Sequence, residues 1–151
     1  MSGYCRSSTN PCLQPQNRQT TTACIPCDPE KYCNAAGLSS PSGLCTAGWV
    51  CLNSAVLGTP AVPAQGYECG VGTYCPAGSN LPLNCDGGKY CSTTGLGAPT
   101  NNCDAGYYCV YNSSVQNPTD GTKGAQCLAG YYCVAGSVSQ TPCPAGTSPT
   151  L

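Results

Sequence analysis

Apolar residues in this 151-residue chain occur in short clusters and follow no helical period. No stretch sustains apolar positions every 3.6 residues, and glycine or proline interrupts the chain about every ten residues. Aromatic and β-branched residues gather at 107–111 (YYCVY) and 131–135 (YYCVA), which is typical of short strands. The pattern therefore predicts short β-strands, hairpins and turns, with essentially no helix.

A seven-residue segment that begins and ends with cysteine, here called a frame, organises this pattern. Its six copies are CDPEKYC (27–33), CTAGWVC (45–51), CGVGTYC (69–75), CDGGKYC (85–91), CDAGYYC (103–109) and CLAGYYC (127–133). Five frames carry glycine at position four, which suits a turn with positive φ. Glu30 takes that position in the first frame, so a different turn is expected there. We predict that each frame is a tight turn leading into a strand of two to four residues.

The frames belong to a larger repeat of 58 residues. The segments between frames are 11, 17 and 9 residues long, and then the series starts again. Residues 27–84 and 85–142 align without a gap and share 21 identical positions, so we predict two tandem repeat units that touch only near Asn84 and Cys85. A cysteine-rich cap or partial repeat at 1–26 precedes them, and 143–151 starts a further repeat. Small disulfide-rich modules in an elongated tandem array are the expected fold.

Composition indicates an oxidising compartment. The chain has 16 cysteines, an even number that full pairing requires. This density marks a disulfide scaffold, and disulfides persist in secreted or cell-surface proteins, so an extracellular location is expected. Charged residues make up 7% of the chain and the net charge is −1, so no basic patch is available for nucleic acid or anionic lipid. No apolar run reaches the roughly 20 residues that span a bilayer, so we expect no membrane insertion.

Two pairing schemes remain open for the cysteines. In one, each frame closes on itself, and with Cys5–Cys12 this leaves Cys24 and Cys143 alone. In the other, the second cysteine of each frame joins the first cysteine of the next. That scheme consists of Cys12–Cys24, Cys33–Cys45, Cys51–Cys69, Cys75–Cys85, Cys91–Cys103, Cys109–Cys127, Cys133–Cys143 and Cys5–Cys27. We favour the second scheme because it uses all cysteines within one chain. Pro149 stands where a seventh frame would have its second cysteine, so we expect the native chain to continue.

The motifs around the cysteines resemble the ephrin-receptor-like cysteine-rich repeat. The matching stretches are TACIPCDPEKYC (22–33), CPAGS (75–79), CLAGYYC (127–133) and CPAGTSPT (143–150). The hallmark of that family is Cys-Pro-Ala-Gly-Thr/Tyr-Tyr, often preceded by Cys-x-Pro-Cys. The resemblance covers about residues 22–150 and implies an extracellular module, as in receptor ectodomains, protist or algal surface proteins and flagellar hairs (mastigonemes). It implies no catalytic residues.

Catalytic and metal chemistry have little support in the sequence. There is no histidine, and the one Cys-x-x-Cys pair, Cys24 with Cys27, lacks the second knuckle of a structural zinc site. The carboxylates are spread along the array, which is too sparse for calcium, so Asp28, Asp86 and Asp104 are expected to cap turns. We therefore expect no enzyme activity, no metal and no cofactor.

Attached sugar is better supported. Asn112-Ser113-Ser114 is an N-glycosylation sequon in one of the 17-residue segments between frames, and we predict a glycan on Asn112. Serine and threonine beside proline, as in 39–42, 58–63 and 146–151, favour O-glycans. Covalently attached glycans would solvate a surface that has few charges.

Two classes of function remain. One is a structural subunit of an extracellular filament, hair or coat, with copies of the same chain as partners, and the other is a ligand-binding or adhesive ectodomain segment. Regular repeats favour the first, whereas tyrosines aligned on one face would also suit a binding stripe. A recognition surface usually concentrates arginine and aromatic residues, and here they are distributed. The predicted assembly face consists of Trp49, Tyr74, Tyr107, Tyr108, Tyr131 and Tyr132.

Overall fold

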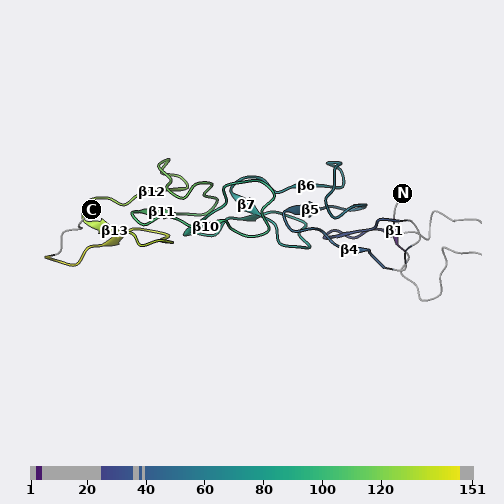
Figure 1. Ribbon diagram of the computed structural model, residues 1–151, viewed down its shortest axis with the longest axis horizontal. Helices are drawn as coiled ribbons and strands as arrows, with labels where there is room; N and C mark the ends of the chain where they lie inside the picture. Colours follow the sequence, from purple (N-terminus) through teal and green to yellow (C-terminus); the bar gives the residue numbers. More distant parts are fainter. Residues whose placement is uncertain (1–2, 5–24, 36–37, 39, 147–151) are drawn as a thin grey trace, which may run out of the picture. The chain divides into compact units, whose positions relative to one another are not determined.

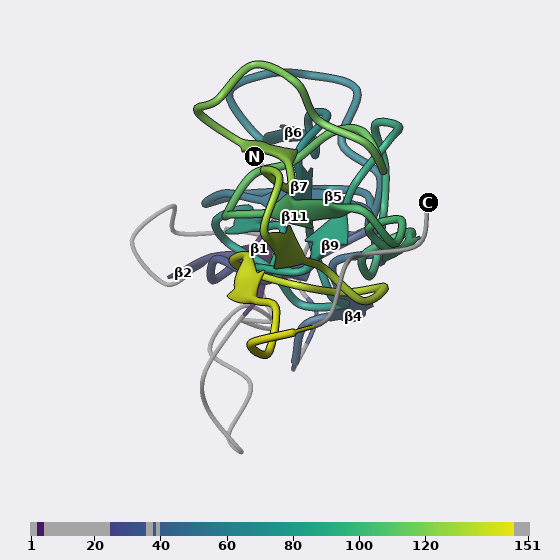
Figure 2. The same ribbon diagram turned by 90° about the vertical axis from the view of Figure 1, so that its left-hand side faces the viewer.

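The computed structural model describes residues 3–4, 25–35, 38 and 40–146. Within these residues there is no helix, and the strands form seven two-stranded antiparallel sheets. The pairs are β1 (Gly3–Tyr4) with β2 (Ile25–Pro26), β3 (Lys31–Tyr32) with β4 (Gly43–Leu44), β5 (Trp49–Cys51) with β6 (Gly66–Glu68), β7 (Thr73–Tyr74) with β8 (Leu83–Asn84), β9 (Lys89–Tyr90) with β10 (Asn101–Asn102), β11 (Tyr107–Cys109) with β12 (Gly124–Gln126), and β13 (Tyr131–Tyr132) with β14 (Thr141–Pro142). In both views of the ribbon, the strands are short and most of the chain runs in turns and loops (Figures 1 and 2). The predicted class, tandem disulfide-rich modules of short strands and turns, is confirmed.

The described residues divide into two compact units. The first comprises the residues up to Cys69 together with Cys75–Pro82, and the second comprises Gly70–Tyr74 and the residues from Leu83 onwards. The units therefore interleave in sequence at the frame 69–75. The cysteines of that frame belong to the first unit and its turn belongs to the second.

Each frame supplies the first strand of a hairpin. The strand begins at frame position five, and position five pairs with the residue immediately before the next frame, as in Lys31 with Leu44 and Lys89 with Asn102. From β3 onwards each such pair has two or three residues in register. Two-stranded hairpins of this size are marginal by themselves in water, so covalent bridges and contacts between frames must stabilise them.

Every described frame closes on itself through a disulfide. The bridges are Cys27–Cys33, Cys45–Cys51, Cys69–Cys75, Cys85–Cys91, Cys103–Cys109 and Cys127–Cys133. The favoured scheme, which joined successive frames, is therefore wrong at every bridge that it drew between two described cysteines. Among the described cysteines, Cys143 has no disulfide, and Cys5, Cys12 and Cys24 lie outside the described residues. The bridges indicate an oxidising environment.

The turn inside the frame explains the pairing. The amide of position five donates to the carbonyl of position two in all six frames, as from Lys89 to Asp86 at 3.1 Å. Position four has φ between 73° and 89° throughout. A turn whose third residue has positive φ reverses the chain, and the Cα atoms of the two cysteines lie 5.6 to 6.2 Å apart, within the usual disulfide range. Glu30 adopts φ 73°, so the different turn expected in the first frame is not formed.

Backbone hydrogen bonds join each frame to the next. The amide of position four donates to the carbonyl of the next frame's second cysteine, and its carbonyl accepts from the amide of the next frame's first cysteine. The first bond links Glu30–Cys51, Gly48–Cys75, Gly72–Cys91, Gly88–Cys109 and Gly106–Cys133 at 2.7 to 3.1 Å. The second links Cys45–Glu30, Cys69–Gly48, Cys85–Gly72, Cys103–Gly88, Cys127–Gly106 and Cys143–Gly130 at 2.7 to 2.9 Å. The bond from Gly72 to Cys91 corrects the expectation that the two repeats touch only near Asn84 and Cys85.

Two further backbone bonds complete four of these junctions. Each of these junctions joins an earlier frame to the frame that follows it. The residue three positions after the second cysteine of the following frame is here called the junction residue. Its amide donates to the carbonyl of the first cysteine of the earlier frame. The junction residues are Ser54, Gly78, Asn112 and Gly136, bonded to Cys27, Cys45, Cys85 and Cys103 at 2.9 to 3.0 Å. The carbonyl of the residue after the junction residue accepts from the amide of the second cysteine of the earlier frame, as Ser113 does from Cys91 at 2.9 Å. All four junction residues have positive φ, between 65° and 81°.

The buried interior consists largely of disulfides. Ten of the twelve bridged cysteines expose no surface, Cys133 is 7% exposed, and Cys127 is partly buried. Three small clusters gather around these sulfur atoms, and one of them packs Ala55 and the partly buried rings of Tyr32 and Trp49 against the bridge 45–51. Because no larger apolar core forms in the described residues, the disulfides and junction bonds carry most of the stability.

Candidate functional site

The predicted assembly residues occupy two consecutive positions of the frame. Trp49, Tyr107 and Tyr131 lie at position five, and Tyr74, Tyr108 and Tyr132 lie at position six. Consecutive residues of a strand point to opposite faces, so these six side chains do not form a single stripe. Of the six, Tyr131 and Tyr132 are exposed, at 37% and 44%, whereas the other four are partly buried.

Position six carries tyrosine in five of the six frames, and two of these tyrosines are missing from the predicted set. Tyr32 packs against the disulfide cluster of the next frame, Cys45 with Cys51, as expected for an aromatic face beside a neighbouring bridge. Tyr90 donates from its hydroxyl to Oε1 of Gln116 at 3.3 Å. Recurrence of tyrosine at this one position is the sequence signal that identifies both residues.

The frames 69–75 and 127–133 occupy equivalent places in the two repeats but differ in exposure. Gly72 is buried, and a Cβ placed on it would lie 2.9 Å from the carbonyl oxygen of Asn112. Gly130 is exposed, and a Cβ there would meet no described atom within 4 Å. Around Gly130 the apolar side chains of Leu128 and Val134 are 64% and 62% exposed. Together with Tyr131 and Tyr132, which point to opposite faces of β13, they are the exposed side chains that we call the open frame surface.

The sequon residue Asn112 is a junction residue and not part of a free loop. Its backbone amide donates to the carbonyl of Cys85 at 3.0 Å, and its φ is 65°. Its Oδ1 is buried and has no hydrogen-bond partner among the described residues. Ser113 is completely buried and donates from its hydroxyl to the carbonyl of Val115 at 2.9 Å. The predicted glycosylation site is thus built into a contact between frames.

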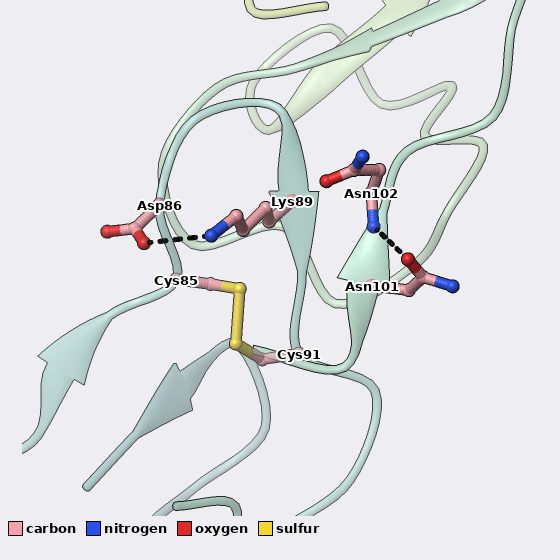
Figure 3. A network of polar contacts seen from close by, with 6 residues as sticks. All are labelled: Cys85, Asp86, Lys89, Cys91, Asn101 and Asn102. Atoms are coloured by element: carbon pink, nitrogen blue, oxygen red, sulfur yellow. Dashed lines mark hydrogen bonds and ion pairs between the residues drawn. A yellow bond between two sulfur atoms is a disulfide. The ribbon is translucent and has the colours of Figure 1, made fainter. Parts of the chain in front are cut away.

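Charged side chains make local contacts. Figure 3 shows the closed frame 85–91, where Nζ of Lys89 lies 3.8 Å from Oδ2 of Asp86, and both side chains are about half exposed. Such exposed ion pairs contribute little to stability. Beside this pair, the amide of Asn102 donates to Oδ1 of Asn101 at 2.8 Å (Figure 3). The frame 85–91 therefore offers polar contacts but no cluster of charge.

A clear side-chain cap is formed by Asp120, which was not among the aspartates expected to cap turns. Its Oδ1 lies 2.9 Å from the amide nitrogen of Thr122 and 2.8 Å from that of Lys123. These hydrogen bonds, first to Lys123 and then to Thr122, favour the ionised form and lower the pKa of Asp120. The geometry is that of an Asx turn, which aspartate forms readily in loops.

The described surface contains a shallow groove beside the sequon. It has a volume of about 300 Å³ and is lined by Tyr90, Ser92, Ser114, Val115, Gln116 and Asn117. Its lining includes neither a carboxylate nor a cationic side chain. Throughout 3–4, 25–35, 38 and 40–146, no three or more His, Cys, Asp or Glu side chains are grouped as metal ligands would be. The same residues contain no helix long and apolar enough to cross a membrane.

The sequence matches no protein-family model, and no curated protein is significantly similar to it.

Proposed function

We propose that this chain is a structural subunit of an extracellular filament, hair or surface coat, built from glycosylated repeats of the ephrin-receptor-like, mastigoneme type. The observation that carries the proposal is the junction between frames. The hydrogen bonds that define this junction run between backbone atoms, so it depends on the cysteine spacing and on a left-handed residue at position four. Modules that join in this way suit a repetitive structure whose side chains vary freely.

The open frame surface supports self-association. It combines the exposed rings of Tyr131 and Tyr132 with the apolar side chains of Leu128 and Val134. The chain as a whole has only 5 basic and 6 acidic residues, so charge repulsion opposes association weakly. Identical subunits that meet head to tail form open filaments when the rotation between them does not close a ring. The low charge and the regular frames therefore support the structural role.

The disulfides suit a load-bearing, extracellular role. Six bridges close loops within single frames, and ten of their cysteines expose no surface. Buried bridges hold each frame together when the weaker junction bonds open, and they resist proteolysis outside the cell. Attached sugar would add solubility to subunits before assembly.

Truncation of the open frame surface tests the proposal. The double variant Tyr131→Ser/Tyr132→Ser should raise the concentration needed for assembly by about tenfold or more, because buried tyrosines often dominate an interface. The matched control is Tyr111→Ser, which removes a tyrosine that is 70% exposed and lies outside the frames. Sedimentation and negative-stain microscopy measure assembly, and mass spectrometry verifies the disulfides.

Two results would contradict the filament proposal. If the purified chain stays monomeric at high concentration and binds a defined protein or sugar tightly, the ligand-binding ectodomain replaces the filament as the better function. Equal effects of the two variants would show that assembly does not use the open frame surface.

A further inference from the structure

We propose that Asn112 accepts an N-linked glycan only before the junction between frames 85–91 and 103–109 has formed, and that folding then closes the site. The proposal rests on the glycosylated part of the proposed function and not on the filament. A glycan on Asn112 would then show that sugar transfer preceded closure of the junction.

The backbone of the sequon is held against a closed frame at two points. The amide of Asn112 donates to the carbonyl of Cys85, and the next carbonyl, that of Ser113, accepts from the amide of Cys91 at 2.9 Å. These bonds tie the sequon to both cysteines of the frame 85–91. An enzyme that needs the sequon as an accessible peptide must therefore break two hydrogen bonds and pull the segment off the frame.

The side chains and neighbours add to the obstruction. Oδ1 of Asn112 is buried, and Ser113 in the middle of the sequon has no exposed surface. The carbonyl oxygen of Asn112 also faces the turn of another frame, where a Cβ on Gly72 would lie only 2.9 Å away. The sequon thus contacts two frames besides the one that it follows, although Asn112 and Ser114 keep some exposure at the edge.

The transfer step shows why this geometry matters. Nδ2 of Asn112 forms a bond to the anomeric carbon of a lipid-linked sugar diphosphate, and the bond from that carbon to the diphosphate oxygen breaks. The lipid diphosphate leaves with the electron pair, and Nδ2 gives up one proton to a base of the transferase. The enzyme must hold the asparagine amide and the hydroxyl of Ser114 together during this step, which requires the whole tripeptide to be accessible.

Equivalent positions show that the junction itself does not need asparagine. Ser54 stands at the matching place in the first repeat, and glycine stands at Gly78 and Gly136. Asparagine tolerates positive φ better than most residues, so Asn112 fits the junction in the folded chain. The sequon therefore has a conformational role after folding and an acceptor role before it.

The test compares the folded and the reduced chain as acceptors. Both forms, produced without glycosylation, are treated with purified oligosaccharyltransferase and a lipid-linked donor, and occupancy is measured by mass spectrometry. We expect transfer to Asn112 to be at least about tenfold slower in the folded chain, because only locally opened molecules react. Replacing both Cys85 and Cys91 by serine should restore much of the rate.

A second sequon supplies the control. The substitution Pro82→Thr creates a sequon that begins at Asn80, at a bend where Asn80 and Leu81 are exposed. Asn80 should accept sugar in the folded chain faster than Asn112 does, which separates the junction effect from a general effect of folding. Equal rates at Asn112 in the folded and reduced chains would overturn the proposal. If the reduced chain accepts sugar at Asn80 but none at Asn112, glycosylation of Asn112 is refuted, and the filament proposal is unaffected.

Discussion

The repeats 27–84 and 85–142 form the same frames and junctions from mostly different side chains. Ser54 and Asn112 are equivalent, both have φ 65°, and they make the same bond to Cys27 and Cys85. Yet only 21 of the 58 aligned positions are identical. Cysteine spacing and a few left-handed positions therefore determine this fold, whereas most other side chains are free to differ.

At one left-handed position the first repeat has glutamate and the second has glycine. Position four of the first frame is Glu30, with φ 73°, and its equivalent is Gly88, with φ 80°. A Cβ on Gly88 would overlap the carbonyl oxygen of Gly136. Glutamate thus fits the first repeat but has no room in the second.

Placing each of these two residues at the position of the other should give the largest change in the free energy of unfolding. Gly88→Glu is expected to lower the free energy of unfolding by about 3 kcal/mol or more, because a strained φ and a backbone overlap add together. Glu30→Gly should change it by less than about 1 kcal/mol, since relief of strain offsets greater freedom in the unfolded chain. Denaturant unfolding with intact disulfides measures both. Equal losses would show that the two turns are equivalent after all.

The sequence predicted the local elements well because they depend on single residue types. Absence of helix in the described residues, strands at the end of each frame and positive φ at the position-four glycines follow from glycine, proline and cysteine spacing. The strands predicted at 107–111 and 131–135 are formed but end at Cys109 and Tyr132, where the chain leaves the hairpin. Local chemistry was therefore sufficient for these features.

The disulfide pairing and the junction hydrogen bonds could not be predicted from single residue types. Counting cysteines treated Cys143 as needing a partner, whereas the bridge within a frame depends on how far one turn brings two Cα atoms together. The junction bonds use backbone atoms, which leave no trace in residue identity. The exposure of the predicted assembly residues could not be predicted for the same reason. The partial burial of Tyr74 and the exposure of Tyr132 depend on contacts between frames.

Disulfide mapping tests whether both repeats close their frames alike. Trypsin cleaves after Lys31 and Lys89, inside two frames, and after Lys123, between two others. With closed frames and without reduction, the fragments on either side of Lys89 stay joined through Cys85–Cys91. The fragment 124–151 then has no bridge to 90–123. If those two fragments remain linked, as Cys109–Cys127 would require, the closed frames are refuted.

Removal of one bridge in each repeat should have smaller and similar effects. The variants Cys27→Ser/Cys33→Ser and Cys85→Ser/Cys91→Ser each open a loop of the same length. Loop closure over so few residues contributes about 2 kcal/mol through the entropy of the unfolded chain. Denaturant unfolding of both variants measures the loss. A much larger loss in one repeat would show that its junctions depend more strongly on the closed frame.

The loops 52–65 and 110–123 show a second difference between the repeats. In the first, the carbonyl of Val62 accepts from the amides of Gln65 and Gly66 at 2.8 and 3.2 Å. In the second, the equivalent residue is Asp120, and its side chain accepts from the amides that follow it. A carbonyl does not titrate, whereas a carboxylate does, so only the second loop should respond to pH.

The smallest expected effect is therefore a local titration at Asp120. Its pKa is lowered in the folded chain, so this turn is stabilised above the pKa of the unfolded chain and loses that stabilisation as pH falls through the folded value. The amide resonances of Thr122 and Lys123 should shift with a midpoint below that of an unperturbed aspartate, and those that bond to Val62 should not move with them. Asp120→Ser keeps an acceptor oxygen and should abolish the titration. A midpoint at or above the ordinary aspartate value would show that the carboxylate does not hold this turn, and the two loops would then differ in sequence alone.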